Sequence, residues 1–115
     1  MPTIAESTAL VTIINVFVVE PSNQQKLLDI LARATETAVR DMPGFVSAAL
    51  HRSLDGTRVT MYGQWESKEH YRHYIATRST PGASPYVDQA LAIAKFDPAT
   101  YEVTKVFVGP SKPLR

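Results

Sequence analysis

The sequence predicts an α+β fold in which four strands form one antiparallel sheet and helices cover a single face of it. Three observations support this prediction: β-branched runs alternate with helical periodicity, an Asp-Gly turn joins two central strands, and 115 residues suit one domain. The expected order is strand, helix, strand, strand, helix, helix, strand (β-α-β-β-α-α-β), the split βαβ or ferredoxin-like arrangement. Residues 1–115 are therefore treated as a single domain, with a core at about 10–108 and a loose C-terminal tail.

The first strand and the first helix follow from composition and periodicity. Residues 10–19, LVTIINVFVV, are β-branched and aromatic, which favours a strand. Pro21 ends this strand, and Ser22 followed by Gln25 has the spacing of a capping box. Apolar and small side chains then recur at helical spacing, so an amphipathic helix is predicted over about 23–41.

A β-hairpin is predicted next. The Pro-Gly pair at 43–44 ends the helix, and residues 45–54 alternate between apolar and polar side chains. The Asp-Gly pair at 55–56 is a strong turn signal, and residues 57–65 form the returning strand.

Two shorter helices and a final strand complete the chain. Ser67 can cap a helix that continues to about residue 77, and the breaker-rich residues 78–84 predict a mobile loop. Another helix starts with Pro85 at its first position and closes at the Asp-Pro pair at 97–98. Residues 102–108 are predicted to form the last strand.

The first strand is apolar on both faces, because successive side chains point in opposite directions. The two sets are Val11, Ile13 and Phe17 on one face, and Leu10, Ile14, Val16 and Val18 on the other. Helices can cover only one face of the sheet, and monomers seldom expose a large apolar patch. A homodimer that buries the uncovered sheet faces against each other is therefore expected.

Composition excludes several classes of protein. Hydrophobic residues make up 44% of the chain and charged residues 20%, which argues against disorder. Twelve Lys and Arg against eleven Asp and Glu give a net charge of +1, so no nucleic-acid or membrane partner is expected. The chain has no cysteine, which excludes disulfides, thiolate nucleophiles and cysteine metal sites. The apolar run at 10–19 is too short for a membrane span, and a cytoplasmic protein is expected.

The common signatures of catalysis are absent from the sequence. His70 and His73 lie three residues apart on a predicted helix. Lys68 and Arg72 lie close to them in the sequence, which predicts that this face of the helix is exposed to solvent. No HExxH or GxSxG pattern occurs, and the five glycines are scattered rather than gathered in a phosphate loop. No metal and no nucleotide are therefore expected.

Four polar or aromatic residues stand inside apolar stretches. Asn15 interrupts the apolar face of the first strand, where a hydrogen bond to a loop and a role in a pocket are about equally plausible. His51 is more often a partly exposed strand end than a ligand. Trp65 and Tyr71 are most simply core aromatics, although the indole N–H needs an acceptor or a ligand.

The order of these residues adds information that none of them carries alone. The segments PGFVSAALHRSLDGT and VTMYGQWESKEHYR resemble the antibiotic biosynthesis monooxygenase family, and the resemblance covers about residues 10–108. These are small cofactor-independent oxygenases of aromatic polyketide pathways. The resemblance implies the dimeric α/β-barrel form of the ferredoxin-like fold, with no cofactor.

The resemblance also assigns roles to residues. Trp65 matches the family's pocket tryptophan, and Tyr71 matches a helix tyrosine implicated in substrate binding. His51 falls where an anthrone oxygenase has a pocket histidine, and Asn15 matches an asparagine of an anthracyclinone oxygenase. Met61 departs from the pattern, because both relatives carry a catalytic asparagine there.

Two further positions differ from relatives. Asp88 stands near the place where one relative has a pocket arginine. The haem-degrading relatives need a histidine on the third helix, and residues 84–96 contain none, so haem is not expected.

The leading expectation is a cofactor-independent monooxygenase that oxidises an aromatic phenol, hydroquinone or anthrone-type polyketide with O₂. In this hypothesis Asn15 donates to the substrate oxyanion, His51 is the base and Tyr71 orients a carbonyl. The expected walls of the cavity are Trp65, Phe17, Val59, Met61 and Tyr74. The alternatives are a non-catalytic dimeric barrel that binds a hydrophobic small molecule, which the methionine at 61 favours, and a polyketide cyclase or isomerase.

Overall fold

The computed structural model describes residues 10–78 and 85–110. Its strands are β1 (Val11–Val19), β2 (Phe45–Arg52), β3 (Arg58–Trp65) and β4 (Ala94–Tyr101), and its α-helices are α1 (Gln24–Ala34), α2 (Lys68–Arg78) and α3 (Pro85–Ile93). A 3₁₀ turn (Pro21–Asn23) precedes α1, and a π-helical turn (Thr35–Val39) follows it. Of the loop predicted at 78–84, Arg78 is instead the last residue of α2, and residues 79–84 lie outside the described residues, as does the chain beyond residue 110.

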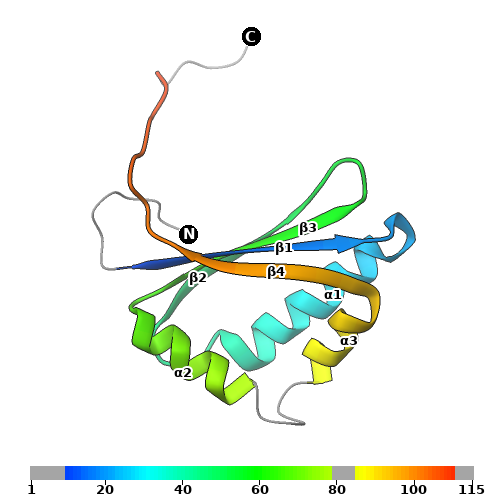
Figure 1. Cartoon of the computed structure of the whole chain (residues 1–115), viewed down its shortest axis with the longest axis horizontal. Coiled ribbons are helices and arrows are strands. Elements are labelled where there is room, and N and C mark those ends of the chain that lie inside the picture. The colour runs from blue at the N-terminus through cyan, green and yellow to red at the C-terminus, as the bar shows by residue number, and fades with distance from the viewer. Residues whose placement is uncertain (1–9, 79–84, 111–115) are drawn as a thin grey trace.

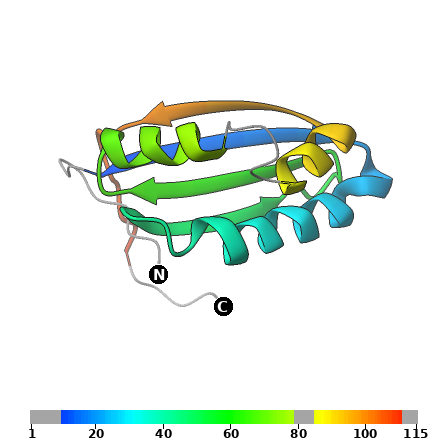
Figure 2. The same ribbon diagram turned by 90° about the horizontal axis from the view of Figure 1, so that it is seen from below.

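The four strands form one antiparallel sheet in the order β2-β3-β1-β4. All three α-helices lie on the same face of this sheet, as the two views show (Figures 1 and 2). The α+β, ferredoxin-like arrangement predicted from the sequence is confirmed. Among residues 10–78 and 85–110, no helix has the length and apolar character that a membrane crossing requires.

The core lies between the sheet and the helices and consists of two clusters. One cluster gathers around Leu27 and Val59, both fully buried, and includes Phe17 of β1. The other contains Ile13 and Trp65. Because β1 pairs with β3 on one side and β4 on the other, its inward side chains contribute to both clusters.

In the part of the chain that the structure describes, no helix lies over the opposite face of the sheet. Ile14 and Val16 are partly exposed there, and Val18 is 52% exposed. The apolar outer face predicted from the alternation of β1 is therefore present in the structure. The homodimer inferred from it stays a prediction.

The last strand differs from the prediction. β4 spans Ala94–Tyr101 and residues 102–110 have no regular secondary structure, so the strand predicted at 102–108 is wrong. The Asp-Pro pair at 97–98 does not close a helix but lies within β4, opposite Val16 and Asn15. An edge strand tolerates proline because one side of it needs no N–H donors. Residues 102–110 run away from the sheet (Figure 1).

The start of α1 also differs from the prediction. Neither Ser22 nor Gln25 makes a capping hydrogen bond, because the 3₁₀ turn precedes the helix. The buried Gln24 side chain instead donates from Nε2 to the carbonyl oxygens of Ser53 and Arg58, each at 3.0 Å. This contact ties the helix to the hairpin loop, and spacing within the helix alone does not reveal it.

The predicted hairpin turn between β2 and β3 is confirmed and is held by Asp55. Its Oδ1 accepts hydrogen bonds from the Thr57 hydroxyl at 2.7 Å, the Thr57 N–H at 3.0 Å and the Ser53 hydroxyl at 2.8 Å. These hydrogen bonds, those from Thr57 first, lower the pKa of Asp55 from 3.8 to about 2. Gly56 follows with a φ of +82°, which explains the glycine.

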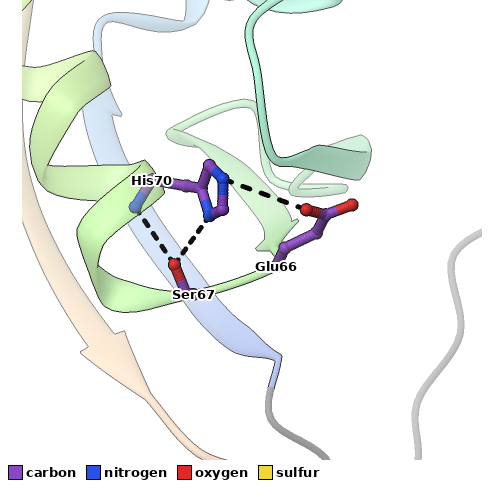
Figure 3. Close-up of polar contacts among 3 residues, drawn as sticks. All are labelled: Glu66, Ser67 and His70. Carbon is purple, nitrogen blue, oxygen red and sulfur yellow. Dashed lines mark hydrogen bonds and ion pairs between the residues drawn. The ribbon is translucent and has the colours of Figure 1, made fainter.

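The predicted cap of α2 is confirmed, and it involves a neighbouring histidine. The Ser67 Oγ accepts the backbone N–H of His70 at 3.2 Å and lies 2.7 Å from the His70 Nδ1 (Figure 3). The Glu66 Oε2 lies 4.0 Å from the His70 Nε2. The serine and the imidazole thus hold the start of α2.

Gly44 lies beneath this histidine and has no room for a side chain. Its φ is +83°, and a Cβ atom there would overlap the His70 ring. Its carbonyl oxygen accepts the backbone N–H of Glu66 at 2.8 Å. The Pro-Gly signal at 43–44 therefore marks both a turn and a close approach of α2 to the backbone before β2.

We predict that Gly44→Ala lowers the free energy of unfolding by roughly 2 kcal/mol or more, because it combines left-handed strain with a steric clash. Gly56→Ala is the matched control, since it shares the positive φ but its Cβ would meet only Pro21 at 3.4 Å. Urea unfolding should show that His70→Gly, which removes the ring and also the His70 Cβ that a side chain at position 44 would overlap, reduces the cost of Gly44→Ala and leaves the cost of Gly56→Ala unchanged. Equal costs for Gly44→Ala in both backgrounds would contradict the clash.

Candidate active site

A cavity of about 100 Å³ lies between the inner face of the sheet and the three α-helices. β1 contributes Ile13, Asn15 and Phe17, and the other strands and all three helices supply the remaining wall. Most of the lining is aliphatic or aromatic. A mostly apolar cavity with a few polar groups is the usual form of a small-molecule site.

Six of the eight predicted site residues line this cavity. They come from three separate elements: Asn15, Phe17, Met61, Trp65, Tyr71 and Tyr74. Val59 does not line it, because its side chain is fully buried in the core against Phe17 and Leu27. Val59 therefore supports the wall from behind rather than facing a ligand.

His51 lies on the other face of the sheet. It pairs with Thr60, whereas its neighbour Leu50 pairs with Met61 of the cavity. Its side chain is exposed, and the sheet separates it from the cavity of its own chain. The prediction that His51 is a base in the pocket of this chain is therefore wrong.

A β-bulge explains where His51 points. The register of β2 on β3 shifts between Phe45 and Ser47. Phe45 consequently shares the inner face with Trp65, whereas the later odd-numbered residues of β2 point outward. Strict alternation from Phe45 would have turned His51 inward, because one inserted residue reverses the face of every residue after it.

Trp65 is the centre of an aromatic cluster in the cavity wall. Its ring is stacked on Tyr74 at 5.0 Å between centroids with an interplanar angle of 22°. Phe45 and Tyr71 approach it edge-on, at 5.5 and 6.0 Å. The indole is only 3% exposed. These contacts hold a flat wall of the kind against which an aromatic ligand stacks.

Tyr71 offers the cavity a hydrogen-bond donor. Burial raises the pKa of its hydroxyl above the ordinary value near 10, although the positive charge of Arg78 lowers it in part. A phenol with a raised pKa stays protonated at neutral pH. Tyr71 is therefore suited to donate a hydrogen bond to a carbonyl or an oxyanion and unsuited to act as a base.

Asn15 carries a polar atom without a partner. Its Oδ1 is buried and accepts no hydrogen bond within the part of the chain that the structure describes. Its cross-strand neighbours are Met61 on β3 and Pro98 on β4, and neither side chain has a donor. An unpaired buried polar atom costs about 1–3 kcal/mol, so a ligand hydroxyl that donated to it would recover stability.

The sequence does not predict three polar residues of the cavity, Thr35, Arg78 and Tyr86. The sequence places Arg78 at the start of a predicted loop, but it is the last residue of α2 and lies four residues after Tyr74. Side chains at this spacing share a helix face, so the periodicity of α2 could have revealed it. Tyr86 follows Pro85 in α3 and had no comparable signal.

Metal-ligating side chains do not gather in the described residues. Nowhere in residues 10–78 and 85–110 do three His, Asp or Glu side chains converge as a metal site requires. His70 is engaged with Ser67 and Gly44, and His73 is exposed on α2.

Comparison with known proteins identifies the family of the chain. The profile of the family described as antibiotic biosynthesis monooxygenase matches residues 10–80, well over half of the sequence. The chain belongs to the antibiotic biosynthesis monooxygenase family. The resemblance found in the segments around Trp65 is thereby confirmed.

Individual members of the family are similar over nearly their whole length. The tetracenomycin-F1 monooxygenase of Streptomyces glaucescens is 41% identical over 111 residues, which are 96% of each chain. The monooxygenase ActVA-Orf6 of Streptomyces coelicolor, solved with the ligand nanaomycin D, is 27% identical with a TM-score of 0.70, covering 90% of this chain and 94% of the other.

A third relative confirms the fold. SnoaB, a cofactor-independent oxygenase from Streptomyces nogalater, superposes with a TM-score of 0.72 at 22% identity, covering 86% of this chain and 97% of that chain. At this level of identity the likeness concerns the fold alone.

We predict that Asn15→Leu stabilises the free protein by about 1 kcal/mol, because it replaces an amide whose buried Oδ1 has no partner among the described residues by an apolar group of similar shape. Thr12→Val is the matched control: the Thr12 Oγ1 is also buried without a described partner, but it lies on the outer face of β1. Thermal unfolding should show stabilisation by both changes, and only Asn15→Leu should weaken binding of hydroxylated aromatic ligands. Equal binding in the two variants would contradict the role of Asn15.

Proposed function

We propose that this protein is a cofactor-independent monooxygenase that oxidises a phenolic, hydroquinone or anthrone-type aromatic substrate with O₂. The observation that carries this proposal is the 41% identity, over 96% of both chains, with a protein named tetracenomycin-F1 monooxygenase. The apolar, aromatic cavity supports the same proposal.

The chemistry balances without an external reductant. In an anthrone-type substrate a ring CH₂ becomes a carbonyl, one oxygen atom of O₂ forms that carbonyl, and the other leaves as water. The substrate supplies all four electrons. Loss of a proton first gives an electron-rich anion, which transfers an electron to O₂, and the two radicals combine at carbon. The protein has to bind the anion, exclude water and place O₂ beside it.

The described residues can perform these tasks. Trp65, held in place by its stack on Tyr74, supplies an aromatic wall, and Tyr71 donates to the developing oxyanion. Asn15 accepts a hydrogen bond through Oδ1 from a substrate hydroxyl. This assignment differs from the sequence-based expectation, in which the amide donated to an oxyanion. The cavity of about 100 Å³ is smaller than the roughly 150 Å³ that holds benzene, so a polycyclic substrate requires movement at its mouth.

A non-catalytic barrel that binds a hydrophobic ligand is the second candidate. Met61 favours it, since its thioether lines the cavity beside Asn15 and cannot donate a hydrogen bond. A cyclase or isomerase acting on a similar ligand would use the same cavity. The cytoplasmic location and the absence of nucleic-acid and membrane partners stay predictions from the sequence.

Oxygen consumption tests the proposed reaction. We predict uptake of one O₂ per substrate, above the uncatalysed rate, when chelator-treated protein is given anthrone or hydroquinone substrates. Tyr71→Phe should lower kcat/KM about 100-fold, because it removes a donor to the developing charge, whereas Tyr101→Phe on the exposed outer face should have no effect. Binding without O₂ uptake would contradict the proposal and favour the binding protein. Product formed without O₂ uptake would favour a cyclase or isomerase.

We further propose that the outer face of the sheet forms a homodimer. Ile14, Val16 and Val18 of β1 lie there, together with Tyr62 of β3, and no helix of residues 10–78 and 85–110 covers them. Charged side chains occur at the periphery of this face, including Lys95. An apolar centre with a polar rim is the usual composition of such an interface.

Val16→Lys tests this interface. The new ammonium would lie opposite Asp97 of β4, so the monomer can still fold, but a dimer would have to bury the charge. Sedimentation equilibrium should give twice the chain mass of 12.7 kDa for the native protein and a single chain for the variant. Leu91→Lys on α3, also an exposed position, should leave the mass doubled. A monomeric native protein would contradict the proposal.

A further inference from the structure

The cavity contains one unmatched charge. Among its described lining residues Arg78 alone is charged, and the other polar groups are neutral amide, hydroxyl and indole groups. No carboxylate lies within ion-pair distance of the Arg78 guanidinium in the described part of the chain. The following residues in the sequence, STPGAS at 79–84, carry no charge either.

Arg78 is held at the cavity by an aromatic stack. Its guanidinium carbon lies 5.3 Å from the centroid of the Tyr74 ring, and Tyr74 is stacked in turn on Trp65. The side chain is partly buried. A cation–π contact engages the flat face of the guanidinium and leaves the N–H donors at its edge available. The position of the guanidinium is therefore set, while none of its N–H groups donates a hydrogen bond to residues 10–78 or 85–110.

An anionic group would complete this arrangement. An anion in an apolar cavity is strongly disfavoured without a cation, and a planar guanidinium can offer two parallel N–H donors to a carboxylate or a single donor to a phenolate. The proposed reaction also needs a substrate anion, yet the described lining contains no histidine or carboxylate to generate it. A substrate that enters already ionised does not need such a base.

We propose that Arg78 binds an anionic oxygen group of the substrate, a carboxylate or an ionised phenol, and so makes the cavity selective for acidic aromatic molecules. This inference rests on the proposed function and names the substrate class of the same cavity. Tyr71, two turns before Arg78 on the same side of α2, supplies a neutral donor to the same cavity.

Ligand binding tests the inference without relying on turnover. Trp65 is the single tryptophan, it lines the cavity and it is stacked on Tyr74, so quenching of its fluorescence reports occupancy. The probes are an anthraquinone carboxylic acid against its carboxamide, and an ionised hydroxyanthraquinone against its methyl ether. The first pair tests carboxylate recognition and the second tests phenolate recognition. All four probes are already at the quinone level and are not oxidised further.

Arg78→Met should weaken binding of the preferred anionic probe about tenfold or more and leave its neutral partner unchanged. Arg78→Lys should keep part of the preference for the anionic probe, because it retains the positive charge but lacks the two parallel N–H donors of the guanidinium. Arg72→Met is the matched control, since Arg72 is an exposed arginine of α2 that does not line the cavity. Circular dichroism and the thermal midpoint of each variant show whether it is folded.

The two pairs of probes and the oxygen assay together distinguish a failure of the role proposed for Arg78 from a failure of the proposed oxygenase reaction. An anion preference in either pair that is lost in Arg78→Met and kept in Arg72→Met supports the inference and identifies the group. Equal binding of anionic and neutral probes, or a preference that survives Arg78→Met, overturns it. O₂ uptake without an anion preference would overturn the role of Arg78 alone. An anion preference without O₂ uptake would overturn the proposed oxygenase reaction and leave the binding role standing.

Discussion

The alternation of side chains along β1 is the constraint on which the rest of the structure depends. β1 pairs with β3 over Val11–Val18 and with β4 over Thr12–Val19, so its central inward residues Ile13, Asn15 and Phe17 each lie between two neighbouring strands. Ile13 and Phe17 belong to different core clusters, and Asn15 lies between them. The cavity opens where β1 presents an amide instead of an apolar group. A strand that filled this position with a large aliphatic side chain would join the two clusters into one continuous core.

Elements that are determined by neighbouring residues in the sequence could be predicted from local patterns. The β-branched run of β1, the Asp-Gly turn and the Ser67 cap all appear as expected. The prediction placed the last strand too late in the sequence, because it took the Asp-Pro pair at 97–98 as the end of a helix. The pair can lie within β4 because β4 is at the edge of the sheet, where a strand tolerates proline. The outcome for His51 has the same origin, since a bulge in β2 reverses its face and the sequence has no glycine or proline at Val46 to announce it.

The candidate site was predictable to the extent that aromatic residues with regular spacing share a face. Trp65, Tyr71 and Tyr74 meet as their positions in β3 and α2 suggested. Val59 shares the inner face of β3 with them but lies in the core, because depth along the strand decides between cavity and core. The alternation of side chains along a strand shows which face of the sheet a residue lies on, but not whether it lines the cavity or is buried in the core. The packing of α1 against the sheet decides between the cavity and the core.

The polar groups of the cavity have a common physical character. Asn15 has an unpaired oxygen and Arg78 has an unmatched charge within the described residues, so each is less stable in the free protein than a paired group would be. A ligand with a hydroxyl and an acidic group would satisfy both, and its binding energy would then include the recovery of these costs. The stacking of Arg78 on Tyr74 limits the penalty before binding, because the cation is held against an aromatic face rather than fully desolvated. Selectivity in such a cavity arises from polar groups that have no hydrogen-bond or ion-pair partner among the described residues until a ligand binds.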